Sequence, residues 1–332
     1  MVLEKRAFHN LLKEVNLEQE GSFEERDFVE VSCPLVDALD NEIIMHRDSH
    51  FGGNFSIMLQ YYENDGVGVN PDLDLSRIKA LAKLEEGLGK NIAGEVLSAS
   101  EAEFVAKSRK SYRSLREIYE LKNHENKCPV LIADLILTEE EGAGKEIQAV
   151  IQEGPVMLPF LINLLRNDEF QNPLFPGYGL APSLAAKCIG RLGDERGVAP
   201  LFEVIGKENE ELEFCAIEAL KRIGEPSKEF LLKVLKTPPL SRDNQNASMV
   251  LSLAFGGDER VAMECFSFLK REGRLEKMVE VFLIHACAGL KGGDREAFKI
   301  WSSSSKDLGS DVYRDLQALF KDWEEEEDTK KV

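Results

Sequence analysis

Apolar residues recur through the second half of the chain at the spacing of helices that bury one face. One such stripe precedes residue 193, and the same spacing returns 31 residues later. The two stripes are Ala185, Cys188, Ile189, Leu192 and Ala216, Ala219, Leu220, Ile223. Residues at these intervals share one side of a helix, so each stripe predicts a helix with a buried face. Small residues alternate with large ones, which lets neighbouring helices approach closely.

A glycine followed by an acidic residue separates each such stripe from a second one. These pairs, 31, 33 and 36 residues apart, are Gly193-Asp194, Gly224-Glu225, Gly257-Asp258 and Gly293-Asp294. Glycine commonly ends a helix in the left-handed conformation, and aspartate caps the first turn of the next helix. The repeating unit is therefore predicted to be a helical hairpin, and stacked hairpins would bury a continuous core.

The segment AAKCIGRLGDERGVAPLFEVI (185–205) resembles the short HEAT-like repeats of phycobilisome-lyase type, and AIEALKRIGEPSKEFLLKVL (216–235) repeats the pattern more loosely. The resemblance covers about residues 146–308 and is strongest over 184–236. It implies an all-α fold, an α-α superhelix or solenoid. Because proteins of unrelated function share this architecture, the resemblance implies no lyase chemistry.

The N-terminal part of the chain fits the repeat less well but is also predicted to be helical. Gly52-Gly53-Asn54 matches Gly256-Gly257-Asp258, so we interpret residues 28–64 as an early, divergent helix pair. Further helices are expected at about 74–97, 99–122 and 128–140. The expected organisation is a divergent helical region at 1–127, a HEAT-like solenoid at 128–320 and an acidic tail at 321–332.

The formal net charge is −19, from 60 acidic and 41 basic side chains, and it is spread over both halves of the chain. Such a field disfavours nucleic acid and acidic membrane surfaces and favours another protein or peptide, a basic one, as the partner. The N-terminus has acidic residues where a secretory signal would be apolar, and the six cysteines form no CxxC pair. These features predict a cytoplasmic protein with reduced thiols and no membrane span.

The segment MHRDSHFGG (45–53) is one candidate site. His46 and His50 share a helix face with Asp48 nearby, and imidazole and carboxylate groups are common metal ligands. The segment lacks the wider H-E-x-x-H context, and histidines in the last turn of a helix already suit its dipole. The segment therefore leaves two interpretations. One is a metal- or small-ligand-binding enzyme centred here, and the other is a protein with no cofactor.

A basic cluster interrupts the acidic chain. Its members are Lys107, Arg109, Lys110, Arg113 and Arg116, and no acidic residue lies between Phe104 and Arg116. On a helix several of these side chains share a face, so an acidic peptide, a phosphate or a nucleic acid could bind there. The alternative is a solvated face that pairs with the protein's own carboxylates.

Residues 167–182, NDEFQNPLFPGYGLAP, are predicted to form a loop because three prolines and two glycines oppose regular structure. Phe170, Phe175 and Tyr178 give this loop more apolar surface than a linker needs. It could bind a partner or fold back as a lid, or its aromatic rings could cover the edge of the adjacent repeat.

No catalytic constellation accompanies the repeats, so the sequence favours a protein-interaction scaffold or adaptor over an enzyme. We expect the partner to bind a concave surface formed by the second helices of successive hairpins. The candidate residues on that surface are Asn163, Arg166, Glu203, Lys207, Lys228, Lys233, Glu264 and Lys270.

Overall fold

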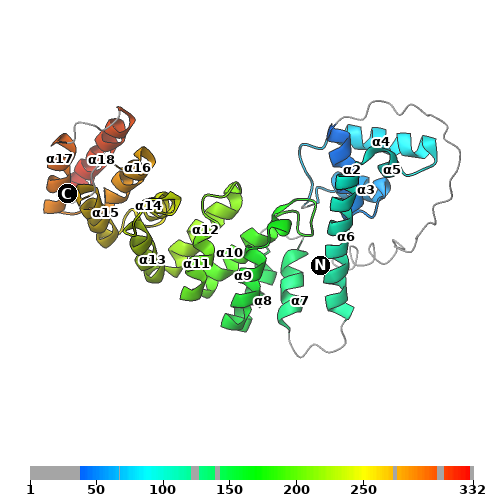
Figure 1. Ribbon diagram of the computed structural model, residues 1–332, viewed down its shortest axis with the longest axis horizontal. Helices are drawn as coiled ribbons and strands as arrows, with labels where there is room; N and C mark the ends of the chain where they lie inside the picture. Colours follow the sequence, from blue (N-terminus) through cyan, green and yellow to red (C-terminus); the bar gives the residue numbers. More distant parts are fainter. Residues whose placement is uncertain are drawn as a thin grey trace. The chain divides into compact units, whose positions relative to one another are not determined.

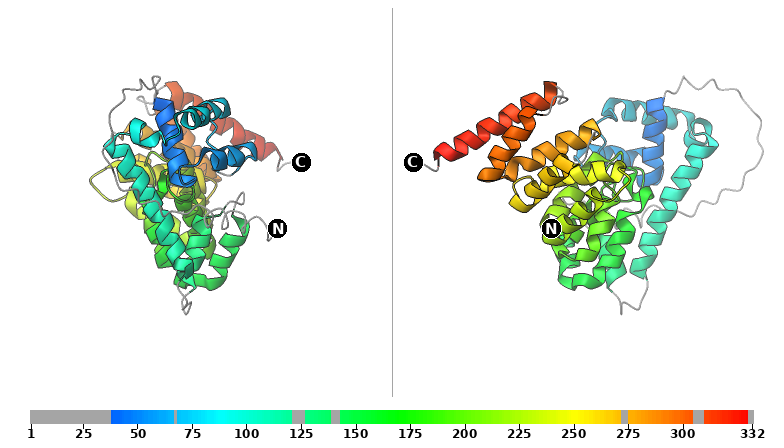
Figure 2. Two further views of the ribbon diagram at one scale, coloured as in Figure 1. Left: turned by 90° about the vertical axis from the view of Figure 1, so that its right-hand side faces the viewer. Right: turned by 60° about the vertical axis from the view of Figure 1, so that its left-hand side comes forward.

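The computed structural model describes residues 38–66, 68–120, 127–138, 143–271, 275–304 and 310–329. Throughout these ranges the chain forms helices and connecting loops without a strand, which confirms the expected all-α fold (Figure 1, Figure 2). The chain divides into two compact units. The first comprises residues 1–146 and 168–181, and the second comprises 147–167 and 182–332.

The first unit is a bundle of helices around α2. Its helices are α2 (Ala38–His50), α3 (Phe55–Glu63), α4 (Leu75–Leu88), α5 (Ala93–Val96), α6 (Ala99–Glu120) and α7 (Cys128–Ile136). Helix α2 packs against α4, α5 and α6, while α3 packs on α4 and α7 packs on α6. Ile43, Ile44, Met58 and Ile78 are fully buried in this core. The apolar positions of α2, α3 and α4 thus meet in one small core.

The Gly52-Gly53 turn reverses the chain between α2 and α3, as the sequence pattern predicts. Both glycines have positive φ angles, 61° and 80°. Asn54 then caps α3, because its side-chain oxygen accepts hydrogen bonds from the backbone N–H groups of Ser56 and Ile57 at 2.8 and 3.3 Å.

The second unit consists of helix pairs that follow one another along the chain. The first helices of the pairs are α8 (Gly144–Glu153), α10 (Ala181–Leu192), α12 (Glu210–Ile223), α14 (Arg242–Phe255) and α16 (Lys277–Ala286). The second helices are α9 (Leu158–Leu165), α11 (Val198–Phe202), α13 (Glu225–Leu235), α15 (Glu259–Arg271) and α17 (Gly293–Ser304), and α18 (Ser310–Thr329) follows. Helices α8 and α10 begin at the boundaries between the two units.

Helices of the same kind pack side by side in the second unit. Helix α14 contacts α12 and α16, and α16 contacts α18. In the other row, α11 contacts α9 and α13, and α15 contacts α13 and α17. Two rows stacked in this way form the solenoid that the spacing of 31 to 36 residues predicts (Figure 1).

Two of the predicted hairpin junctions have the expected cap. Gly193 has a φ of 67°, and the Asp194 carboxylate accepts a hydrogen bond from the Arg196 backbone N–H at 3.0 Å. The Asp258 carboxylate caps α15 in the same way, with the Val261 backbone N–H as donor at 3.0 Å. These side chains satisfy first-turn N–H groups that have no partner inside the helix.

The last junction differs from the prediction. The turn lies at Gly292, which has a φ of 51°, and α17 begins at Gly293. Asp294 therefore lies within the first turn, where its charge still suits the helix dipole but where it is not the capping residue.

Close packing between the first helices confirms the role expected of their small residues. A Cβ atom added to Gly190 on α10 would lie 2.6 Å from the Cα atom of Ala219 on α12. Only a glycine allows this approach without a shift of one helix.

Candidate functional site

Helix α2 carries a row of buried polar side chains. Asp40, His46, Arg47, Asp48, Ser49 and His50 are each at most 6% exposed. Because α2 lies between α4, α5 and α6, charged groups at these positions need partners inside the protein.

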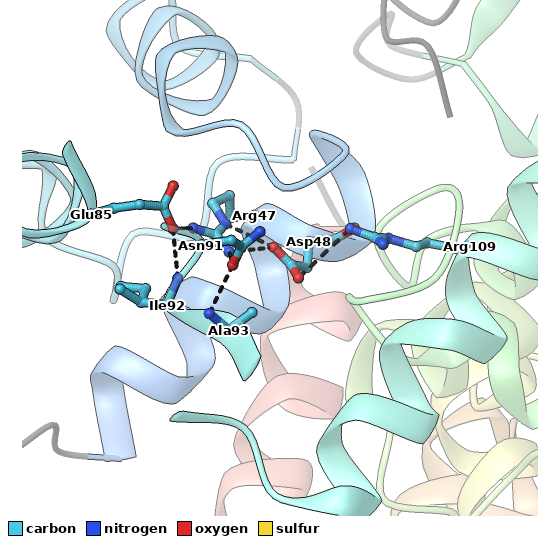
Figure 3. A network of polar contacts seen from close by, with 7 residues as sticks. All are labelled: Arg47, Asp48, Glu85, Asn91, Ile92, Ala93 and Arg109. Carbon is cyan, nitrogen blue, oxygen red and sulfur yellow. Dashed lines mark hydrogen bonds and ion pairs between the residues drawn. The ribbon is translucent and has the colours of Figure 1, made fainter. Parts of the chain in front are cut away.

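Arg47 is the centre of an ion-pair network (Figure 3). Its guanidinium donates from Nε to Asp48 Oδ1 at 2.8 Å, from Nη1 to Glu85 Oε2 at 2.6 Å and from Nη2 to Asn91 Oδ1 at 2.9 Å. The ring centroid of Phe55 lies 4.4 Å from the Arg47 Cζ atom. The charge of this fully buried side chain is thus matched by two carboxylates, an amide oxygen and an aromatic face.

The partners of Arg47 also accept hydrogen bonds from the backbone at the start of α5. Glu85 Oε2 accepts a hydrogen bond from the Ile92 N–H at 3.0 Å, and Asn91 Oδ1 accepts one from the Ala93 N–H at 2.8 Å (Figure 3). The network therefore fixes the start of α5 against α2.

Arg109 on α6 extends the network to a second cation. Its Nε donates to the Asp48 backbone oxygen at 2.7 Å, and its Nη2 lies 3.6 Å from Asp48 Oδ2. Gly53 closes over these groups, because a Cβ there would lie 3.3 Å from Asp48 Oδ1 and 3.5 Å from Arg109 Nη2. The Gly52-Gly53 turn thus serves close packing against the network as well as chain reversal.

His50 connects α2 to two other segments of the first unit. Its Nε2 lies 2.8 Å from the Pro173 carbonyl oxygen, and its Nδ1 lies 2.7 Å from the Tyr112 hydroxyl oxygen. A carbonyl only accepts hydrogen bonds, so Nε2 carries the proton and Nδ1 accepts from Tyr112. Burial, with the nearby His46 adding to the effect, holds the pKa of His50 well below its ordinary value.

His46 lies beside His50 in an aromatic environment. The two imidazole centroids are 4.7 Å apart, and the rings of Phe51, Tyr62 and Tyr178 surround His46 at 5.6 to 6.2 Å. Burial lowers the pKa of His46 to about 4. Its Nε2 atom is buried without a hydrogen-bond partner among the described groups. Both imidazoles are therefore neutral at pH 7.

Residues 168–181 pack against these histidines as part of the first unit. The segment begins with the short helix η2 (Asp168–Gln171) and continues as turns. Ser108 Oγ donates to the Leu174 carbonyl at 2.5 Å, and the Tyr178 ring lies 4.4 Å from the His50 ring. Phe175 is 1% exposed and contacts Phe104 edge to face at 5.4 Å. Phe170 in turn contacts Phe175. The aromatic residues of this segment thus supply part of the core of the first unit.

The three candidate metal ligands, His46, Asp48 and His50, are close in sequence but have different partners. Asp48 binds Arg47 and Arg109, whereas His50 binds Tyr112 and Pro173. Among the described residues, no set of three His, Cys, Asp or Glu side chains has a geometry that could hold a metal ion. The structure does not bring His46, Asp48 and His50 together as ligands.

The basic cluster lies on α6, where, within the described part of the chain, some of its side chains form ion pairs and others do not. Lys107 pairs with Glu103 at 3.1 Å, and Arg116 pairs with Glu120 at 3.0 Å, in both cases one turn away on the same helix. Lys110 and Arg113 are exposed and have no ion-pair partner among the described residues. The cluster is therefore only partly neutralised by the protein itself.

The residues expected on a surface of the second helices form ion pairs between neighbouring hairpins. Arg166 binds Glu203 through two hydrogen bonds of 2.7 Å. Lys228 Nζ lies 2.8 Å from Asp258 Oδ2, and Glu264 accepts from Lys236 at 2.7 Å. The remaining candidates differ: Asn163, Lys207 and Lys233 are exposed without an ion pair in the described ranges, and Lys270 lies over the Phe266 ring. Much of this surface thus joins one repeat to the next.

An open apolar groove lies between the first helices α14 and α16. It has a volume of about 980 Å³. Leu253, which is 59% exposed, Val281 and Phe282 provide its apolar walls, and Lys221 and His285 lie at its rim. Leu253, Val281 and Phe282 thus lie together around one open groove, and contiguous exposed apolar surface is common at binding sites.

Sequence reasoning missed this groove and the partners of Arg47. Leu253 lies off the stripe of Val250, Leu251 and Ala254 that α14 buries, so an isolated apolar residue on its polar face was an available signal. Glu85 and Asn91 had no such signal, because they are 38 and 44 residues from Arg47 in sequence.

Comparisons with known proteins agree with the architecture. A family model described as HEAT repeats matches residues 158–252. A search of curated proteins finds no match to the chain. The fold and this match define the class: the chain is an all-α protein with HEAT-like repeats.

One helical stretch, Gly144–Leu165, is long and apolar enough to cross a membrane by length and composition alone. It comprises α8, η1 (Gly154–Met157) and α9, and Gly154 at its middle has a φ of 74°. Its most apolar side chains, among them Leu158, Leu161 and Leu165, are buried within the protein. One such stretch is weak evidence for a membrane span.

Proposed function

We propose that this chain is a cytoplasmic protein-interaction scaffold or adaptor without catalytic activity. The observation that carries the proposal is the apolar groove between α14 and α16, on a repeat architecture that commonly binds other proteins. The likeness of residues 185–205 to repeats of phycobilisome-lyase type concerns the repeat alone, and no lyase chemistry is proposed.

The occupant proposed for the groove is a basic polypeptide segment with a large apolar side chain. The net charge of −19 attracts basic partners over distances longer than a hydrogen bond, and it raises their rate of association. Leu253, Val281 and Phe282 then offer apolar surface to a leucine or phenylalanine of the partner. Charge selects the partner, and the apolar contact provides most of the affinity.

Selection of peptides from a displayed library on the full-length protein tests this proposal. Selected peptides are expected to combine Leu or Phe with flanking Lys or Arg. Leu253→Glu should weaken their binding by at least about tenfold, because a charge in an apolar contact lacks a partner. The matched control is Leu240→Glu, since Leu240 is 47% exposed and lies outside the groove.

Two results would overturn the assignment. One is the absence of any enriched peptide at physiological salt. The other is equal loss of binding in Leu253→Glu and Leu240→Glu, which would place the peptides elsewhere on the surface.

A further inference from the structure

The outer face of α6 carries a continuous stripe of cations. Lys107 and Arg116 have side chains that are 55% and 44% exposed, and Lys110 and Arg113 between them are also exposed. Successive members are three positions apart, so each side chain lies beside the next, and the row turns partway around the exposed side of the helix. We refer to Lys107, Lys110, Arg113 and Arg116, with Arg109 beside them, as the α6 stripe.

Among the described residues, carboxylates match only part of the positive charge of the α6 stripe. Glu103 and Glu120 pair with its two ends, and Asp48 lies against Arg109. Exposed ion pairs within one helix contribute little to stability, so a competing carboxylate can replace them. Lys110 and Arg113 have no carboxylate partner among the described residues.

The opposite face of α6 packs inside the first unit, so the backbone that carries the stripe is held in place. Val105, Ser108 and Leu115 are buried, and Ser108 donates to the Leu174 carbonyl. Tyr112 donates to His50 from the same helix. Binding therefore need not order the backbone of this helix, which lowers its entropic cost.

Acidic residues limit the length of the α6 stripe. Lys107 and Arg116 are nine residues apart, which corresponds to about 14 Å along a helix. Exposed carboxylates follow at both ends, from Glu103 on one side and from Glu117 and Glu120 on the other. A nucleic acid strand running past either end would meet these carboxylates, whereas a short acidic peptide would not.

We propose that the α6 stripe is a second docking site, which binds a short Asp- or Glu-rich segment of a partner protein. The guanidinium and ammonium groups would donate charge-assisted hydrogen bonds to the carboxylates of that segment. This site lies in the first unit and does not depend on the groove between α14 and α16. A scaffold with both sites could bind a basic and an acidic partner at once.

Fluorescence anisotropy with the full-length protein and a labelled octaglutamate peptide tests the proposal. The wild type should bind this peptide at 50 mM salt, bind it more weakly at 200 mM salt, and show no binding to octaglutamine. Lys110→Glu with Arg113→Glu should lower the affinity at least about tenfold, because two attractive charges become repulsive. The matched control is Lys79→Glu with Lys83→Glu on α4, which changes the net charge equally and should alter the affinity less than about twofold.

A neutral variant and a groove variant make the result decisive. Lys110→Gln with Arg113→Gln avoids new repulsion within α6 and should still lower the affinity severalfold. Leu253→Glu should leave octaglutamate binding unchanged, so failure of the groove proposal and failure of this one are distinguishable. Equal affinities of the α6 and α4 double variants, or tighter binding to a single-stranded oligonucleotide than to octaglutamate, would overturn the inference.

Discussion

His46 and His50 are placed where a charged imidazole has no counterpart. Aromatic rings surround His46, its Nε2 has no described hydrogen-bond partner, and the closest titratable neighbour is another histidine. The pKa of His46 is lowered to about 4, and that of His50 is lowered well below its ordinary value. The folded first unit therefore requires both rings to be neutral.

This requirement predicts that acid destabilises the first unit. The unfolded chain binds protons at these histidines below about pH 6.5, whereas in the folded chain His46 does not until about pH 4 and the pKa of His50 is also lowered. The free energy of unfolding therefore falls as the pH decreases below about 6.5. His46 alone should account for roughly 2 kcal/mol between pH 7 and pH 5. Urea unfolding at both pH values checks the prediction.

His46→Leu is the informative variant for this pH dependence. It should unfold at a similar urea concentration to the wild type at pH 7 and lose less stability at pH 5. An unchanged pH dependence in this variant would show that the buried imidazole of His46 is not its source.

Helix packing in the second unit depends on small residues at the row of first helices. Gly190 lets α10 approach the backbone of α12 at Ala219, and the capping carboxylates of Asp194 and Asp258 start the second helices. The hairpin of α10 and α11 thus combines a close contact in the row of first helices with a capped turn that leads to the second helix.

Gly190→Ala is expected to destabilise the second unit by about 2 kcal/mol. The new methyl group would meet the Ala219 backbone, which cannot move away without shifting α12. Gly87→Ala near the end of α4 is the control, because nothing lies within 4 Å of its added Cβ. That change should raise stability by up to about 1 kcal/mol through helix propensity. Urea unfolding followed by circular dichroism measures both effects, and equal midpoints would refute the close contact.

The division of the whole molecule into two units does not follow the order of the chain. Residues 168–181 lie between α9 and α10 in sequence, yet they pack against α2 and α6. The chain thus passes from the second unit to the first and back within a few residues. A single mutation in residues 168–181 should therefore destabilise the first unit, although the flanking helices α9 and α10 belong mainly to the second.

Phe175→Ala tests this organisation. Loss of a phenylalanine that is 1% exposed should cost about 3 to 5 kcal/mol. Hydrogen exchange should become faster in α2 and α6 and remain unchanged in α14 and α16. Leu251→Ala in α14, where Leu251 is fully buried, should produce the opposite distribution. Faster exchange in α14 and α16 of the Phe175→Ala variant would contradict the division.

Local pattern was sufficient to predict the helical class, the hairpin period and several turns. The stripes around Cys188 and Ala219, the caps at Asp194 and Asp258 and the Gly52-Gly53 turn all depend on interactions within a few residues. Such interactions leave a trace in the sequence because spacing and residue type determine them directly.

The tertiary structure decided which of the marked residues are exposed and what they contact. Phe175 was marked for its apolar character, and only the packing of 168–181 on α6 shows that it belongs to a core. Arg47 finds Glu85 and Asn91 across many residues, and no spacing rule connects them. The sequence by itself therefore determined the helices and their repetition, which depend on short-range interactions. The buried network and the groove beside Leu253 depend on which faces meet in three dimensions, so the tertiary structure alone decided them. It also decided which members of the basic cluster on α6 are exposed.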